Sequence, residues 1–219
     1  MAEHHDEMET VEELKRWWLE NRWFVIAGVV IGVGAVGGWR GWEWWTVRQA
    51  EAASALYSKV ASAVSAGDAA GYDAQLATLV KDYARTPYAA HGALLVAKAA
   101  VDAGDLAKAQ TQLAWVAAQA RDAELKQLAR VRLARVQLAA GEHDAALATL
   151  DALGAAGAFE GQAQAVRGDT LRVLGRIDDA RAAYQAALAA SGERLADREL
   201  IELKLADLGS APTAVEAAK

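Results

Sequence analysis

The sequence predicts an all-α protein in which a single N-terminal transmembrane helix is followed by a solenoid of helical repeats. Two features indicate this division. Residues 23–39 carry no charged side chain, and seven of the eight tryptophans and six of the eighteen glycines lie between positions 17 and 45. From position 50 onward, apolar residues recur at helical spacing and breaks that contain glycine return at regular intervals. The two parts are therefore expected to have different solvents.

The apolar run from Trp23 to Trp39 is expected to cross a membrane. As a helix it would span roughly 26 Å at about 1.5 Å per residue, close to the thickness of a bilayer core. Arg22 and Arg40 close the run and can extend their charged ends into the headgroup layer, which the flanking tryptophans also favour. The alternative is a cleaved signal peptide. Seven acidic and three basic residues precede the run, whereas a signal peptide begins with a short positive segment, so an uncleaved anchor is favoured.

Four glycines of this run form two pairs at four-residue spacing. The pairs are Gly28 with Gly32 and Gly34 with Gly38. Small residues at this spacing let two helices approach closely in lipid, although glycine is also generally commoner in membrane helices than in soluble ones. Two interpretations stay open: a helix contact, with a partner or with a second copy in a homo-oligomer, or the ordinary composition of a membrane helix.

Glycines also divide the second part of the chain into helical pairs. Gly67, Gly104, Gly141 and Gly175 are each followed by a polar residue, and the last three lie 37 and 34 residues apart. A glycine just past a helix end can adopt the left-handed conformation that closes the helix. Self-similarity at this period predicts stacked supersecondary units.

The similarity between these units extends beyond their turns. Aligning the last three glycines superimposes small residues seven positions before them, small residues five positions after them and larger apolar residues nine positions after them: Ala97, Ala134 and Gly168; Ala109, Ala146 and Ala180; Leu113, Leu150 and Tyr184. Small residues let paired helices pack closely, and the larger residue fills the gap to the next unit. This is the packing of tetratricopeptide repeats, whose period is 34 residues. The unit around Gly67 is less regular, because Tyr72 replaces the small residue.

Two further segments complete the predicted repeat domain. Pro87, preceded by Thr86, is expected to begin a helix. The segment Glu193–Leu208, which includes Leu195, has one more helical pattern and is expected to cover the open apolar face of the last repeat.

No constellation of residues predicts catalysis, a cofactor or a metal site. The chain has no cysteine nucleophile, no Gly-x-Ser-x-Gly sequence and no glycine-rich phosphate loop with a lysine. His91 and His143 have no Asp, Glu or His at ligand spacing. The net charge of −6 argues against a nucleic-acid-binding protein that works through a basic face. Arg130, Arg132 and Arg135 form the only basic cluster, for which a solvated helix face is favoured over an anion or partner site.

A partner-binding surface is the better candidate for a functional site. The first helix of each tetratricopeptide pair lines the concave face of the solenoid. Projected onto this sequence, that face carries Leu94, Lys98, Leu128, Val131, Arg135, Leu138 and Arg172. The mixture of leucines and basic residues suits an extended or partly apolar peptide. The Lys and Asn pattern that clamps a free C-terminal carboxylate is missing, so recognition of chaperone tails by that route is not supported.

The organisation of the chain resembles that of the YfgM-like family. The resemblance covers nearly the whole chain and is carried by V-E-E-L-K-R-W-W-L-E-N-R, by the glycine-rich span that ends G-W-R-G-W, and by R-L-A-R-V-Q-L (Arg132 to Leu138). It implies an ancillary subunit of the bacterial SecYEG translocon in the inner membrane, with a cytoplasmic N-terminus and a periplasmic C-terminal domain. It also implies association with a membrane-anchored periplasmic chaperone of the prolyl-isomerase type, and it offers no catalytic residues.

These expectations divide the chain into four segments. They are an acidic cytoplasmic tail (1–22), a transmembrane helix with its aromatic belt (23–45), a periplasmic tetratricopeptide-like repeat domain (46–208) and a loose C-terminal tail (209–219). The expected function is that of a non-enzymatic, membrane-anchored adaptor that links SecYEG to periplasmic chaperones during protein export. The alternative is a repeat scaffold of another cell-envelope assembly or division complex.

Overall fold

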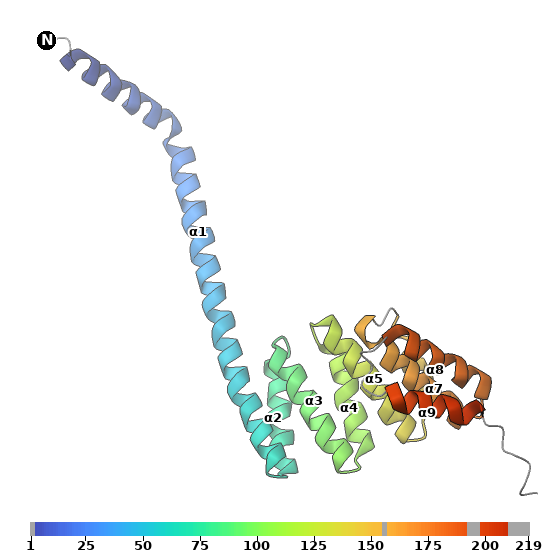
Figure 1. Cartoon of the computed structure of the whole chain (residues 1–219). Helices are drawn as coiled ribbons and strands as arrows, with labels where there is room; N and C mark the ends of the chain where they lie inside the picture. The colour runs from blue at the N-terminus through green and yellow to red at the C-terminus, as the bar shows by residue number, and fades with distance from the viewer. Residues whose placement is uncertain (1–2, 155–156, 192–197, 210–219) are drawn as a thin grey trace, which may run out of the picture. The chain divides into compact units, whose positions relative to one another are not determined.

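The computed structural model describes residues 3–154, 157–191 and 198–209, and in this part of the chain every regular element is a helix, as predicted (Figure 1). The elements are α1 (Glu3–Ser65), α2 (Ala69–Asp82), α3 (Pro87–Asp102), α4 (Leu106–Gln119), α5 (Ala123–Ala139), α6 (His143–Asp151), the 3-10 helix η1 (Gly157–Phe159), α7 (Glu160–Val173), α8 (Ile177–Ser191) and α9 (Arg198–Gly209). The chain divides into two compact units, Met1–Glu51 and Ala52–Lys219.

The first unit consists of the greater part of α1 and contains the apolar run. Among the described residues α1 is the one helix long and apolar enough to cross a membrane: it reaches a mean hydropathy of 1.6 over 18 residues, none of them buried. Trp23, Phe24 and Trp39 are 70, 80 and 75% exposed. Soluble proteins rarely expose a continuous apolar surface of this kind, and this helix is therefore a candidate membrane span.

The helical pairs of the second unit turn at the predicted glycines. Their φ angles are positive: Gly67 69°, Gly104 78°, Gly141 79° and Gly175 74°. After α3, the Gly104 N–H donates to the Val101 carbonyl at 3.0 Å, and the Asp105 N–H donates to the Ala100 carbonyl at 2.8 Å. The same two hydrogen bonds close the preceding helix at all four glycines, which is the Schellman motif. A residue with a Cβ would be strained in this conformation.

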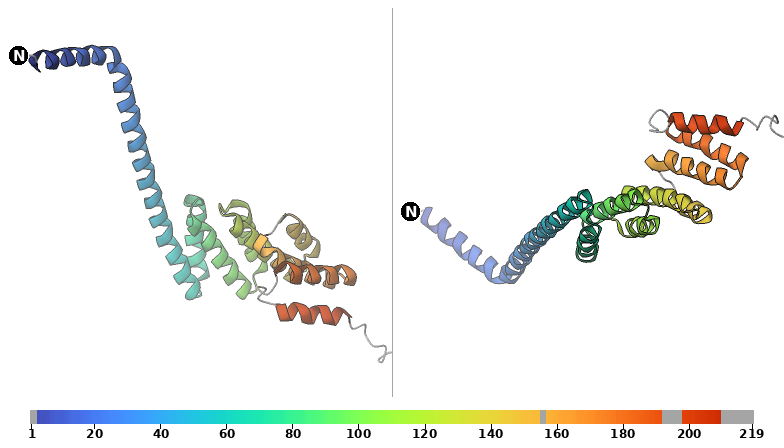
Figure 2. Two further views of the ribbon diagram at one scale, coloured as in Figure 1. Left: turned by 45° about the horizontal axis from the view of Figure 1, so that its top comes forward. Right: turned by 90° about the horizontal axis from the view of Figure 1, so that it is seen from below.

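The helices of the second unit pack in chain order from α2 to α9 (Figure 2). The first helices of successive pairs also contact one another, α3 with α5 and α5 with α7. The eight residues other than glycine that align on the turns are at most 4% exposed, so the predicted register is the packing register. In the pair formed by α7 and α8, a Cβ placed on Gly168 would lie 2.6 Å from two ring atoms of Tyr184, so glycine is required where the larger residue is tyrosine.

The helical pair that turns at Gly67 is more regular than the sequence indicates. The end of α1 supplies its first helix, with Ala53 and Val60 fully buried, and α2 supplies its second. Tyr72 replaces a small residue, yet it is 7% exposed and belongs to the same apolar cluster. The Lys108 ammonium of α4 lies 4.6 Å from the centre of the Tyr72 ring, which places a cation over the aromatic face.

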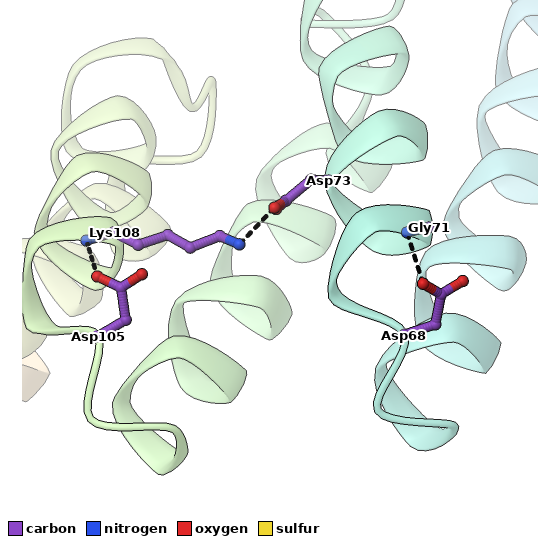
Figure 3. A network of polar contacts seen from close by, with 5 residues as sticks. All are labelled: Asp68, Gly71, Asp73, Asp105 and Lys108. Carbon is purple, nitrogen blue, oxygen red and sulfur yellow. Dashed lines mark hydrogen bonds and ion pairs between the residues drawn. The ribbon is translucent and has the colours of Figure 1, made fainter.

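Polar contacts connect this first pair to the next (Figure 3). Asp68 and Asp105 cap α2 and α4 by accepting from the N–H groups three residues later, at 2.9 and 3.0 Å. Lys108 donates to the Asp73 carboxylate at 2.5 Å and thereby joins α4 to α2. Partial burial would lower the pKa of Lys108, but the hydrogen bond and charge of Asp73 outweigh it and raise that pKa above its ordinary value.

The two further helices predicted from the sequence are also present. Pro87 begins α3, as predicted, with Thr86 before it in an extended conformation. After the last repeat, α9 packs on α8 and covers it, also as predicted. The burial of Ile201 shows this cover, because it is 2% exposed within an apolar cluster that includes Tyr184. Arg181 of α8 donates to the Leu208 carbonyl at 2.9 Å. Leu195 and residues 210–219 of the predicted loose tail lie outside the described residues.

Candidate partner-binding surface

The seven residues projected onto the concave face lie on α3, α5 and α7, and the structure corrects two of them. Leu94 is 8% and Val131 is 1% exposed, and both belong to hydrophobic clusters of the core. Leu94 packs in the cluster formed by the end of α1 and helices α2–α5, and Val131 packs in the cluster that includes residues of α5, α6 and α7. A partner cannot reach Leu94 or Val131.

The other five projected residues remain accessible. Lys98, Arg135 and Arg172 are exposed, and Leu128 and Leu138 are half-buried. Lys98 pairs with Asp102 on its own helix at 2.5 Å, an exposed pair whose contribution to stability is small. Basic side chains and half-buried leucines thus remain accessible on these helices, and their use as a peptide-binding surface stays a prediction.

Asp169 occupies the corresponding position on α7. Asp169 stands six residues before Gly175, as Lys98 and Arg135 stand six residues before their own turn glycines. The repeat register could therefore have identified it. Its carboxylate accepts from the Tyr184 hydroxyl at 2.7 Å and from Lys204 at 2.6 Å. Lys204 could not be found by the register, because α9 follows the last repeat.

The environment of Tyr184 fixes the position of Asp169. Burial, and after it the hydrogen bond and charge of Asp169, raise the pKa of Tyr184 well above its ordinary value. The hydroxyl therefore keeps its proton and donates to the carboxylate at any physiological pH. Lys204 neutralises the charge of Asp169, so this pair adds no net charge to the concave face.

A small hollow opens beside this pair, between α5, α7 and α9. Its volume is about 120 Å³. It is lined by Arg135, Gln162, Ala165, Val166, Asp169, Leu200, Ile201 and Lys204. The hollow thus combines an apolar wall with polar groups from three helices.

The glycine pairs of the apolar run lie on α1. A Cβ placed on Gly28, Gly32, Gly34 or Gly38 would meet no atom of the described chain within 4 Å. A contact of this helix with a second copy or a partner helix stays a prediction. Among the described residues, no three His, Asp or Glu side chains come together in a group that could hold a metal ion.

Comparison with known proteins identifies the family. A family model described as a tetratricopeptide repeat-like domain matches residues 15–210. The ancillary SecYEG translocon subunit of Escherichia coli strain K12 is 34% identical over 95% of this chain and 99% of its own length. The subunits of the same name from Haemophilus influenzae and Aggregatibacter actinomycetemcomitans are 32 and 30% identical, over 69 and 95% of this chain and 74 and 100% of their own lengths. The chain belongs to the family of ancillary SecYEG translocon subunits.

Membership of the family of ancillary SecYEG translocon subunits confirms the resemblance to the YfgM-like proteins. The family model begins within α1 and ends after α9, so it includes both the apolar run and the repeat pairs. No solved structure matches the chain.

Proposed function

We propose that this protein is a membrane-anchored, non-enzymatic adaptor of the SecYEG translocon that links the channel to periplasmic chaperones during protein export. The observation that carries the proposal is the match over nearly the full length of both chains to a protein named an ancillary SecYEG translocon subunit. The partners we propose are SecYEG and a membrane-anchored periplasmic chaperone of the prolyl-isomerase type.

The proposed location is the bacterial inner membrane, with the apolar run of α1 as a single-pass anchor. Basic residues before and after the run support the orientation. Lys15, Arg16 and Arg22 precede it, whereas Arg40 and Arg48 follow it closely. Basic residues concentrate on the cytoplasmic side of membrane helices, so this bias favours a cytoplasmic N-terminus and a periplasmic repeat domain.

The repeat domain supplies the adaptor surface in this proposal. Stacked helical pairs form an extended face that can bind a long segment of a partner without a deep pocket. The accessible residues of that face combine Lys98, Arg135 and Arg172 with the half-buried Leu128 and Leu138. Binding, orientation and local concentration of partners are the activities that such a face supports.

Co-purification from detergent-solubilised inner membranes tests the proposal. The affinity-tagged full chain is expected to recover SecY, SecE and SecG together with the chaperone, whereas a tagged single-pass protein of unrelated sequence recovers neither. Recovery of an outer-membrane assembly or cell-division complex without SecYEG would contradict the proposal and favour the repeat scaffold. In the same experiment, a Gly28→Leu/Gly32→Leu variant tests the predicted contact of α1 with a partner helix or a second copy. Bulky side chains at these positions would separate two closely packed helices, so less of the contacting protein should be recovered.

A further inference from the structure

We propose that the hollow between α5, α7 and α9 binds an acidic side chain within an extended, partly apolar segment of a partner protein. The inference rests on the proposed adaptor function, and it assigns that function a contact site and a partner chemistry. Arg135 is the residue that would pair with the acidic side chain, and the wall formed by Ala165 and Leu200 would contact an apolar neighbour of that side chain.

The size of the hollow suits a single side chain. Its volume is about 120 Å³. A protein cavity of about 150 Å³ is large enough to bind benzene. One carboxylate-bearing or aliphatic side chain therefore fits, whereas a folded element would have to lie across the rim. An extended segment, which presents its side chains one at a time, is the form of partner that matches this geometry.

The charge of the hollow favours an acidic partner. Lys204 and the Tyr184 hydroxyl, at 2.6 and 2.7 Å, already satisfy the carboxylate of Asp169. Arg135 is exposed and, within the part of the chain that the structure describes, forms no ion pair or side-chain hydrogen bond. Among the residues that line the hollow, the two basic side chains of Arg135 and Lys204 outnumber the single carboxylate of Asp169. A guanidinium without a partner is suited to a carboxylate, which it can bind through two parallel hydrogen bonds.

The apolar part of the hollow distinguishes this site from a general basic surface. Of the two neighbouring α9 residues that line the hollow, Leu200 is 49% exposed and Ile201 is 2% exposed. A partner side chain that covers Leu200 would remove apolar area from water, which is favourable. The preferred segment thus carries an aliphatic residue beside its Asp or Glu.

The three arginines of the basic cluster on α5 differ in their contacts. Arg130 donates to the Ala152 carbonyl at 3.3 Å and holds the end of α6. Arg132 is exposed but does not line the hollow. Arg135 alone of the three does so, which makes Arg132 a matched control on the same helix.

A peptide-display selection on the detergent-solubilised full chain provides the test. A library of random dodecapeptides is selected on the wild type, on Arg135→Glu and on Arg132→Glu, and the three proteins are compared by circular dichroism to confirm equal helicity. We expect the wild type and Arg132→Glu to enrich peptides with Asp or Glu next to an aliphatic residue, and Arg135→Glu to lose that enrichment.

The most enriched peptide is then labelled with fluorescein and titrated by anisotropy against the same full chain. Arg135→Gln, or replacement of the acidic residue in the peptide by its amide, is expected to raise the Kd about fivefold, the scale of one partly exposed ion pair. Arg132→Gln is expected to change it less than about twofold. No enrichment, enrichment without acidic residues, or equal selection by Arg135→Glu would overturn the inference. Because SecYEG is absent from this experiment, its failure leaves the co-purification result unaffected.

Discussion

Replacement of Gly168 by alanine tests the packing of the repeats where it is tightest. In an exposed helix this change stabilises, because alanine exceeds glycine in helix propensity by about 1 kcal/mol. Here the added Cβ would lie 2.6 Å from two ring atoms of Tyr184, whereas carbon atoms pack best at about 3.5–4.0 Å. The ring is fully buried and its hydroxyl is bound to Asp169, so it has little freedom to move.

The magnitude follows from these two opposing effects. Overpacking of a core costs about 1–3 kcal/mol, and a contact this short on a fixed ring belongs in the upper part of that range. After subtraction of the gain in helix propensity, Gly168→Ala should lower the free energy of unfolding by about 1–2 kcal/mol. In a domain of this size that corresponds to a fall in Tm of about 2–4 °C per kcal/mol.

The other repeats supply the control for this experiment. Where Gly168 faces Tyr184, the repeats that turn at Gly104 and Gly141 have alanine and leucine in the same register, Ala97 with Leu113 and Ala134 with Leu150. In a Tyr184→Leu background, Gly168→Ala should therefore become stabilising, because the ring that it strikes is gone. Thermal unfolding of the four proteins of this cycle, followed by circular dichroism on a fragment of residues 52–219, measures the change of sign. If Gly168→Ala changed the stability with the same sign in both backgrounds, contact with the Tyr184 ring would not be the cause of the destabilisation.

Three further predictions follow from the same structure. Ala146→Leu and Ala180→Leu, at two fully buried positions, should each lower Tm clearly more than Ala148→Leu, whose side chain is exposed; equal small effects would refute the repeat register. Alkaline phosphatase fused after Lys219 should be active, because the C-terminus is expected in the periplasm, and an inactive but intact fusion would reverse the orientation. The fragment of residues 52–219 should give an almost wholly helical circular dichroism spectrum and a cooperative melt, whereas substantial strand content would contradict the fold.

The features predicted correctly from the sequence are those encoded locally. The turns at Gly104, Gly141 and Gly175 depend on a few consecutive residues, and the burial of Ala146 follows from its distance to its own glycine. The same residue pattern recurs in each repeat, so the alignment of the repeats can be determined without knowledge of their packing.

The features that were missed depend on contacts between segments distant in the chain. Leu94 and Val131 have the spacing of residues on an open face, but each is buried in a cluster to which several helices contribute. The pair of Lys204 with Asp169 joins α9 to α7 across 35 residues, and no repeat relates the two positions. Asp169 itself lies in the repeat register, because it stands six residues before Gly175 as Lys98 and Arg135 stand before their own glycines.

Direct association with the translocon is measured most directly as binding between purified components. The detergent-solubilised full chain is titrated against SecYEG reconstituted in lipid nanodiscs, with empty nanodiscs of the same lipid as the control for insertion of α1 into lipid. We expect saturable binding to the nanodiscs that contain SecYEG, in excess of binding to the empty ones. Equal binding to both would show that the chain recognises only the membrane, and would contradict direct association with the translocon.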